Sequence, residues 1–361
     1  MVTRLVFIIT LFLFLPLSAS ARENRTVVDH LGRTVSIPAK VQRIVPLGGA
    51  ARYVVYLQAF DLVVGIEAME SRVPPTAGRP YNLAIREKAA KLPVVGEGRQ
   101  KPVNHEAIAA LKPDLILTAE GDREQADRLS RLTNCPVIVI DYGGIGVLSL
   151  DRFRQTINLL GNLLDREKRA GQLLKYIESN NAEFGRRITA PSSETVYIGA
   201  VSFRGAHGMT STDPLYYPLV MARGRNLAAG TGKNAHIFID MEQLLVWNPS
   251  VIFIDAAGLK LAREEFSRQK TFYSRLSAFK NSRLYLTMPY NNYHTNLELA
   301  IANGWFVAKV LYPERFREIS PEKKTDEICR VFTGAACYAQ LKKEFGGFGR
   351  LSPVDLGIHA E

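Results

Sequence analysis

Cysteine is scarce in this chain: its 361 residues include only Cys135, Cys329 and Cys337. Three cysteines are too few for a disulfide-rich scaffold, and they form no C-x-x-C pair of the kind that binds zinc or carries out redox chemistry. Cys329 and Cys337 could still pair and close a small loop. Cys135 begins an apolar run, which favours a buried thiol.

Signatures of common enzymes are missing as well. The sequence has no G-x-S-x-G elbow, no H-E-x-x-H helix and no G-x-G-x-x-G turn. A serine hydrolase, a zinc protease and a dinucleotide-dependent enzyme are disfavoured, because each needs those residues at those spacings. We predict that the protein is not an enzyme and needs no cofactor. The alternative is chemistry at an unfamiliar site, which turnover of a bound compound would reveal.

Acidic residues are outnumbered by basic ones. The chain has 46 lysines and arginines against 35 aspartates and glutamates, a formal net charge of +11. This balance favours anionic partners. The basic residues are scattered and do not gather with aromatic residues into a strip, so nucleic acid is not a predicted partner.

Long apolar runs are confined to the amino terminus. Arg4 precedes a largely apolar run over residues 5–15, and Ala19, Ser20 and Ala21 match a small-residue cleavage site. Because a membrane span needs about 20 apolar residues, residues 1–21 are predicted to be a cleaved secretory signal, with an uncleaved anchor as the alternative. No cysteine near this site is available to carry a lipid. We expect a soluble, monomeric protein in the periplasm.

One sequence pattern occurs twice. Residues 106–117 (EAIAALKPDLIL) return as residues 242–253 (EQLLVWNPSVIF), with Glu, Pro and the following apolar run in the same register. Each copy predicts a helix with an acidic first turn, ended by proline and followed by a buried strand. The repeat favours two similar α/β lobes, and an interface between lobes is where small-molecule sites concentrate. Chance similarity of two ordinary α/β units is the alternative.

Alternating strand and helix patterns extend this organisation along the chain. We predict an amino-terminal lobe over residues 22–160, a connecting helix over residues 161–190, a carboxy-terminal lobe over residues 191–340 and a loosely held tail over residues 341–361. Helical periodicity is continuous over residues 148–188. The predicted fold is α/β: two doubly wound lobes with mainly parallel sheets, joined by one long rigid helix, with a ligand cleft between them.

An ordered series of short segments resembles one family of exported receptors. The segments are residues 29–38 (DHLGRTVSIP), 43–45, 64–66, 106–117, 242–254 and 289–296 (PYNNYHTN). Together they are similar to the periplasmic binding proteins that serve ABC importers of iron-siderophore complexes, haem and cobalamin. The resemblance implies two α/β lobes, limited hinge motion, and delivery of the cargo to an inner-membrane permease with its ATPase.

The same resemblance assigns a docking role to two glutamates. In that family, a surface glutamate at the start of the repeated helix in each lobe docks on arginines of the permease, and the matching residues are Glu106 and Glu242. Two carboxylates, one on each lobe, would let a permease sense the spacing of the lobes. The simpler interpretation is that each glutamate complements a helix amino terminus, which contributes about 0.3–1 kcal/mol.

Candidate ligand-binding residues follow from the rule that ligands sit at the carboxyl ends of parallel strands. In the first lobe the rule selects the residues after each strand, including residues 142–144 and, as the main candidates, Gly49, Arg52 and Arg99. Gly49 and Arg52 begin a helix and could bind an anion, although a glycine pair before a helix is more often just a tight turn. The guanidinium of Arg99 lies in a glycine-flanked loop and could bind a carboxylate or oxyanion. In the second lobe the glycine-punctuated loop over residues 202–211 offers Arg204 for a charged ligand and His207 for a metal or an anion.

The turn over residues 290–294 is the strongest candidate. Its candidate ligand residues are Tyr290, Asn292, Tyr293 and His294, and Asn291 lies between the first two. Tyrosine and histidine can bind ferric iron directly or contact a chelate, so Tyr293, His294 and His207 remain possible metal ligands. A structural role, with Tyr290 in the core, is the alternative.

These residues favour a receptor for a metal complex, foremost a ferric siderophore or a related iron chelate. The second hypothesis is an oxyanion receptor for molybdate or tungstate with the same architecture. A third is an envelope sensor or scaffold that binds another protein.

Overall fold

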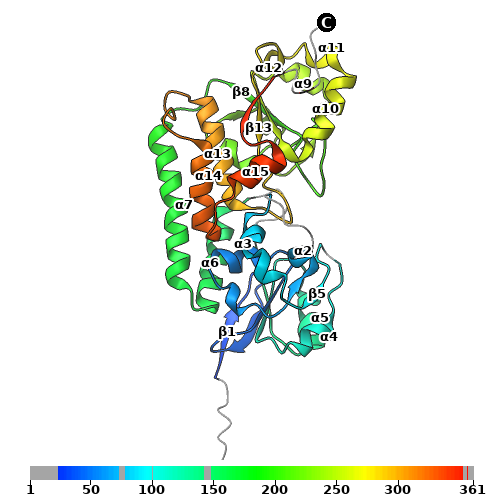
Figure 1. Ribbon diagram of the computed structural model, residues 1–361, viewed down its shortest axis with the longest axis vertical. Helices are drawn as coiled ribbons and strands as arrows, with labels where there is room; N and C mark the ends of the chain where they lie inside the picture. The colour runs from blue at the N-terminus through cyan, green and yellow to red at the C-terminus, as the bar shows by residue number, and fades with distance from the viewer. Residues whose placement is uncertain (1–22, 73–77, 100, 142–147, 353–355, 357–361) are drawn as a thin grey trace, which may run out of the picture.

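The computed structural model describes residues 23–72, 78–99, 101–141, 148–352 and 356. Two α/β lobes lie one above the other and are flanked on one side by long helices (Figure 1). The predicted signal over residues 1–21 and the candidate loop at residues 142–144 lie outside the described residues. Among the described helices, every one is too short or too polar to span a bilayer.

The amino-terminal lobe is built on short parallel strands. The hairpin β1–β2 (Asn24–Val28 and Thr34–Pro38) opens the chain, as its alternating pattern indicates. The main sheet has the order β3-β6-β7 (Ile44–Leu47, Leu115–Thr118 and Val137–Val139), and β4 (Ile66–Glu67) pairs with β5 (Val94–Gly96) beside it. The helices of this lobe are α1 (Ala51–Tyr56), η1 (Phe60–Leu62), α2 (Ala68–Ser71), α3 (Pro80–Ala89), α4 (His105–Ala110) and α5 (Arg123–Thr133).

The carboxy-terminal lobe has a larger sheet. Its order is β10-β8-β12-β13-β14 (Arg225–Asn226, Thr195–Gly199, Val251–Asp255, Leu284–Thr287 and Gly349–Leu351), and all pairs are parallel except β13–β14. A small antiparallel ribbon joins β9 (Ser211–Thr212) to β11 (Ile237–Phe238). The helices are α8 (Tyr217–Met221), η2 (Leu227–Thr231), α9 (Met241–Trp247), η3 (Ala256–Gly258), α10 (Leu259–Arg268), α11 (Lys270–Tyr273), α12 (Ser277–Lys280), α13 (Leu297–Leu311), α14 (Pro321–Thr333) and α15 (Tyr338–Phe345). Helix α13 packs against α8 and α14 and is buried on all sides.

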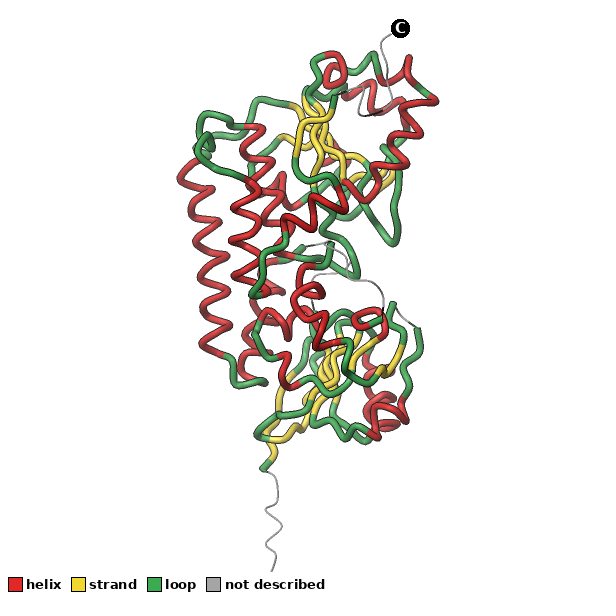
Figure 2. The backbone as a smooth tube through the Cα atoms, viewed as in Figure 1, coloured by secondary structure: helices red, strands yellow, loops and turns green. Residues whose placement is uncertain are grey.

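Two helices, not one, occupy the segment with continuous helical periodicity. Helix α6 (Leu150–Leu163) ends before Asp165, whose φ of 53° is left-handed, and α7 (Glu167–Arg187) packs back against it. Gly161 permits this close packing, since a Cβ there would lie 2.8 Å from the Cβ of Ala170. The connecting helix therefore begins at Glu167. Its 21 residues span about 31 Å and run alongside both lobes (Figures 1 and 2).

The repeated unit has the same local structure in both lobes. Helices α4 and α9 each follow an Asn or Asp at the N-cap, Asn104 and Asp240. Each copy reaches its proline through a left-handed residue, Lys112 (φ 47°) and Asn248 (φ 40°). The helices thus end shortly before the prolines, and the left-handed residue, which the sequence did not reveal, makes the turn into the strand.

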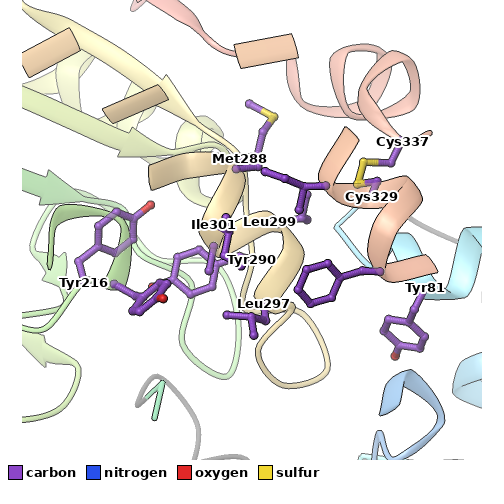
Figure 3. Close-up of a cluster of buried hydrophobic side chains, with 14 of the residues drawn as sticks. Tyr81, Tyr216, Met288, Tyr290, Leu297, Leu299, Ile301, Cys329 and Cys337 are labelled. Carbon is purple, nitrogen blue, oxygen red and sulfur yellow. A yellow bond between two sulfur atoms is a disulfide. The ribbon is translucent and has the colours of Figure 1, made fainter. Parts of the chain in front are cut away.

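Over residues 341–352, the segment expected to be a loose tail is packed against the second lobe. Strand β14 pairs with β13, and Phe348 stacks on Phe306 with ring centroids 4.6 Å apart. Cys329 and Cys337 form a disulfide that joins α14 to the start of α15 (Figure 3). The polar, glycine-rich sequence around Gly346 was misleading, because Gly346 ends α15 in a left-handed conformation and the chain then enters the sheet. Cys135 is buried and free, as predicted.

Candidate ligand cleft between the lobes

A cavity of about 470 Å³ lies between the two lobes. Residues of the amino-terminal lobe and of the carboxy-terminal lobe both line it, so the loop ends of the two sheets converge on one space. The lining residues are Arg99 and Glu120 on one side and Ser202, Arg204, Gly205, Ala206, Ala257, Pro289, Asn291, Asn292, Tyr293, His294 and Phe345 on the other.

The lining follows the carboxyl ends of parallel strands. Arg99 comes after β5, Glu120 after β6, Ser202 after β8 and Ala257 after β12, while residues 289–294 follow β13. Parallel strands place these loops at one end of each sheet. The same topological rule that selected the candidates from sequence therefore explains why they meet.

Two arginines face the cleft from opposite lobes. Arg99 and Arg204 are both exposed, and both lie in left-handed loop conformations with φ of 54° and 55°. Within the described part of the chain, neither guanidinium lies within ion-pair distance of a carboxylate. Arg204 packs on the ring of Phe203, with its guanidinium carbon 5.5 Å from the ring centroid. The cleft thus carries two guanidinium groups that form no ion pair with a described carboxylate, although the acidic side chain of Glu120 also lines it.

The turn over residues 291–294 crosses from the second lobe to the first. The Tyr293 hydroxyl donates a hydrogen bond to Glu67 Oε2 at 2.7 Å, and His294 Nε2 lies 3.0 Å from Glu120 Oε1. The amide of Arg99 donates a long hydrogen bond of 3.4 Å to the Tyr293 hydroxyl. Tyr293 and His294 both have positive φ, 50° and 70°. Contacts to the opposite lobe therefore hold a strained turn at the floor of the cleft.

Glu67 is a buried carboxylic acid under this turn. It is 3% exposed, and burial raises its pKa to about 7, although hydrogen bonds from Tyr293 and from the amide of Gly48 act in the opposite direction. Burial likewise raises the pKa of the Tyr293 hydroxyl, so Tyr293 stays protonated and serves as a donor. The interlobe contact at Glu67 therefore includes a group that titrates near neutral pH.

Arg52 lies below the cleft and does not line it. Its side chain is 1% exposed, packs on Tyr81, and donates hydrogen bonds to the carbonyls of Asn292 and Tyr293. Gly49 has φ of 77°, and a Cβ there would lie 2.7 Å from Cδ2 of His294. Arg52 therefore holds the 291–294 turn in place, and Gly49 leaves room for the ring of His294.

Two other candidates also lie away from the cavity. Tyr290 is 3% exposed and packs against Tyr216 in the core of the second lobe, with ring centroids 5.5 Å apart (Figure 3). His207 is half-buried, and its Nε2 lies 2.7 Å from the carbonyl of Phe203. Of the nine candidate ligand residues, the cavity lining includes Arg99, Arg204, Asn292, Tyr293 and His294.

Sequence reasoning missed Glu67. Glu67 is the last residue of β4. The rule that ligands sit at the carboxyl ends of parallel strands, applied to this strand, would have selected it. Glu120 and Ser202 fell within loops that the rule selected, but neither was singled out. Glu120 is recognisable only from the fold, because its partner His294 is 174 residues away.

Glu106 and Glu242 occupy equivalent places. Each is exposed in the first turn of its helix, α4 or α9. These helices belong to different lobes, and both lie away from α7 (Figure 1). No group of three or more histidine, cysteine, aspartate or glutamate side chains within the described ranges could hold a metal ion.

Comparison with known sequences identifies the family. The sequence model of the family described as periplasmic binding protein matches residues 55–290, well over half of the chain. This chain belongs to the periplasmic binding protein family. Its members are binding proteins and not enzymes, in agreement with the missing catalytic motifs.

Individual relatives of this periplasmic binding protein match over most of their length. The molybdate-binding protein MolA of Haemophilus influenzae is 26% identical over 342 residues, spanning 88% of this chain and 93% of MolA. YvrC of Bacillus subtilis, an uncharacterized ABC transporter substrate-binding lipoprotein, is 23% identical over 81% of this chain and 87% of YvrC.

Solved structures show the same fold. A periplasmic solute binding protein from Veillonella parvula superposes with a TM-score of 0.67 at 21% identity, covering 90% of this chain and 97% of that protein. MolA with molybdate bound superposes with a TM-score of 0.66 at 20% identity, covering 86% and 98%. The α/β fold with parallel sheets is therefore that of a two-lobed periplasmic binding protein.

Proposed function

We propose that this periplasmic binding protein is the substrate-binding component of an ABC importer and that it captures an anionic metal complex, foremost a ferric siderophore or related iron chelate. The observation that carries this proposal is the pair of cationic side chains, Arg99 and Arg204, which face one cleft from opposite lobes and form no ion pair with any carboxylate in the described ranges. An anion between them would be contacted by both lobes at once. Binding would thus favour one relative position of the lobes.

The size and lining of the cleft favour a chelate over a bare ion. A volume of about 470 Å³ lies within the range of small-molecule pockets, roughly 300–1,000 Å³. Tyr293 and Phe345 add aromatic surface, and Ser202 and Asn292 add hydrogen-bonding groups. A bare tetrahedral oxyanion needs a smaller site crowded with N–H donors.

Molybdate or a similar oxyanion is the second candidate. The observation that favours it is the similarity to MolA, which spans most of both chains. Arg99 and Arg204 would also suit an oxyanion, because guanidinium groups bind oxyanions through paired N–H donors. Charge alone does not separate the two candidates, so the ligand must be tested directly.

Titration calorimetry separates the cargo classes. Purified protein is titrated with ferric catecholate, ferric citrate, haem, molybdate and tungstate, with sulfate as a control anion. Tight binding of one iron chelate supports the first candidate, and tight binding of molybdate or tungstate supports the second. Absence of binding by all of them, together with retained binding of an envelope protein, would point to the sensor or scaffold hypothesis.

Matched arginine variants test the site itself. Arg99→Ala and Arg204→Ala should each weaken binding of the identified ligand about 10- to 100-fold, because each removes a charge-assisted contact of about 1.5–3 kcal/mol. Arg186→Ala, an exposed arginine at the end of α7, is the control and should bind normally. Wild-type affinity in the Arg99→Ala, Arg204→Ala double variant would contradict the assignment of the cleft.

Permease docking through Glu106 and Glu242 is the second part of the proposal. Both carboxylates are exposed on equivalent helices, one on each lobe. The Glu106→Ala, Glu242→Ala double variant should bind its ligand normally and fail to support uptake of the labelled ligand by cells. Normal uptake would show that these carboxylates act only at their helix termini.

A further inference from the structure

Four aromatic side chains cluster on the second lobe next to the cleft loop. His236 stacks on Phe203 with ring centroids 4.3 Å apart and an interplanar angle of 4°. The ring of Phe238 packs edge-to-face against His236 and His207, with ring centroids 4.9 Å and 5.0 Å apart. The two imidazoles lie 6.1 Å apart, centroid to centroid. None of these four residues lines the cavity between the lobes.

Hydrogen bonding fixes the tautomer of His236. Its Nε2 lies 2.7 Å from the hydroxyl of Ser211, and that hydroxyl donates its only hydrogen to the carbonyl of Val201 at 2.6 Å. The hydroxyl must therefore accept from His236, so the hydrogen of the neutral ring is on Nε2. The lone pair is then on Nδ1.

The same reasoning applies to His207. Its Nε2 lies 2.7 Å from the carbonyl oxygen of Phe203, which can only accept a hydrogen bond. The hydrogen of His207 is therefore also on Nε2, and its lone pair is on Nδ1. Neither Nδ1 accepts a hydrogen bond from any described residue.

This arrangement matches the way proteins prepare histidines for metals. A metal-binding imidazole usually donates its other N–H to a carbonyl or hydroxyl oxygen, which fixes the ring and its tautomer.

We propose that His207 and His236 form a two-imidazole site for a borderline transition-metal ion, with Cu²⁺ preferred over Ni²⁺ and Zn²⁺. Imidazole nitrogen suits these ions, and the order follows the general affinity series for divalent metals. Water or a group carried by another molecule fills the remaining positions. With two protein ligands the site binds more weakly than a four-ligand structural site. It is separate from the cavity that holds the proposed cargo.

Copper binding to the whole protein, with no cargo added, tests the site. Apo-protein titrated with CuCl₂ should bind one Cu²⁺ ion, and its electron paramagnetic resonance spectrum should show coupling to two imidazole nitrogens. His207→Ala and His236→Ala should each weaken binding at least tenfold and reduce the coupling to one nitrogen. NiCl₂ and ZnCl₂ should bind more weakly than CuCl₂.

Three further variants keep the result interpretable. His236→Gln retains a polar group beside Ser211, so it should lose copper binding while its melting temperature stays close to that of the wild type. His105→Ala, on α4 of the other lobe, and His294→Ala, on the cleft turn, should bind copper as the wild type does. Unchanged affinity and spectrum in the His207→Ala, His236→Ala double variant would overturn the proposal, as would loss of the copper signal in His294→Ala.

Discussion

The two lobes share one repeated unit but contribute differently to the cleft. The amino-terminal lobe presents groups at or soon after the ends of its strands: Glu67, Glu120 and the loop of Arg99. The carboxy-terminal lobe instead extends the turn over residues 291–294 across the gap, where Tyr293 and His294 meet those carboxylates. The repeated architecture therefore positions the loops. The loop sequences decide which lobe extends a turn across the cleft and which lobe supplies the carboxylates that this turn contacts.

Buried contacts reinforce this division on the side near α1. Arg52 of α1 holds the main chain of the crossing turn, and the hydroxyl of Tyr56 donates to Glu298 of α13. All three side chains are almost fully buried. Separating the lobes here would break these hydrogen bonds, and a hydrogen bond to a charged group contributes about 1.5–3 kcal/mol. We therefore expect small adjustments of the lobes and no wide opening.

Removing Arg52, which holds the crossing turn from the amino-terminal lobe, should have the largest effect on stability. Arg52→Ala should lower the free energy of unfolding by about 3 kcal/mol, because it removes the donor to the carbonyl of Tyr293 and creates a cavity. Chemical denaturation measures this change. Arg99→Ala is the matched control on the cleft surface and should cost less than about 0.5 kcal/mol. Equal losses in the two variants would contradict the distinction between holding and lining residues.

The pH dependence of stability should reveal Glu67. Its pKa is about 7 in the folded protein and about 4.5 in the unfolded chain, so the folded state binds more protons between these values. Stability is then fully present below about pH 4.5 and is lost as the pH rises to about 7, by about 3 kcal/mol. Glu67→Gln should remove this contribution.

Denaturation of the wild type and Glu67→Gln across pH 4.5–8 isolates that contribution by difference. Asp213→Asn is the counterpart in the other lobe, since burial also raises the pKa of Asp213 to about 7. Both variants should flatten the profile, but only Glu67→Gln should change ligand affinity. A Glu67→Gln profile parallel to that of the wild type would contradict the titration of Glu67.

Removing the Tyr293 hydroxyl from the carboxy-terminal lobe should have a smaller effect on stability. Tyr293→Phe loses the hydrogen bond to Glu67 and should cost about 1 kcal/mol at neutral pH. Since that bond lowers the pKa of Glu67, its loss should also move the pH-dependent fall in stability to higher pH. A melting profile shifted to lower pH would argue against the Tyr293–Glu67 contact.

The repeated helices should show the smallest differences. Glu106→Gln and Glu242→Gln each remove a carboxylate from the first turn of a helix and should cost about 0.3–1 kcal/mol, similarly in the two lobes. Thermal unfolding measures both. A loss confined to one lobe would show that the two copies of the unit are not energetically equivalent.

The sequence predicts the framework of this molecule better than its contacts. The repeat, the alternation of strands and helices up to about residue 311 and the loops at the carboxyl ends of strands were visible, because they depend on local periodicity and on a general rule of parallel sheets. The break between α6 and α7 was not, since Asp165 in a left-handed conformation leaves no mark in the hydrophobic pattern.

The fate of individual candidates depended on long-range packing. Arg52 and Tyr290 have the residue types of ligand groups, yet both are buried. The contact between Glu67 and Tyr293 joins residues that are 226 positions apart, so the sequence contains no indication of it. The stacked ring pair of Phe203 and His236 likewise joins segments that no local pattern connects.

Strand β14 has a consequence for handling the protein. By pairing with β13 it covers a row of backbone N–H and C=O groups that would otherwise lie at an open sheet edge. Such an edge is a template for strand addition between molecules and for aggregation. A variant truncated after Phe345 should therefore associate with itself at concentrations at which the full chain stays dispersed, and an affinity tag is better kept some distance from Leu351.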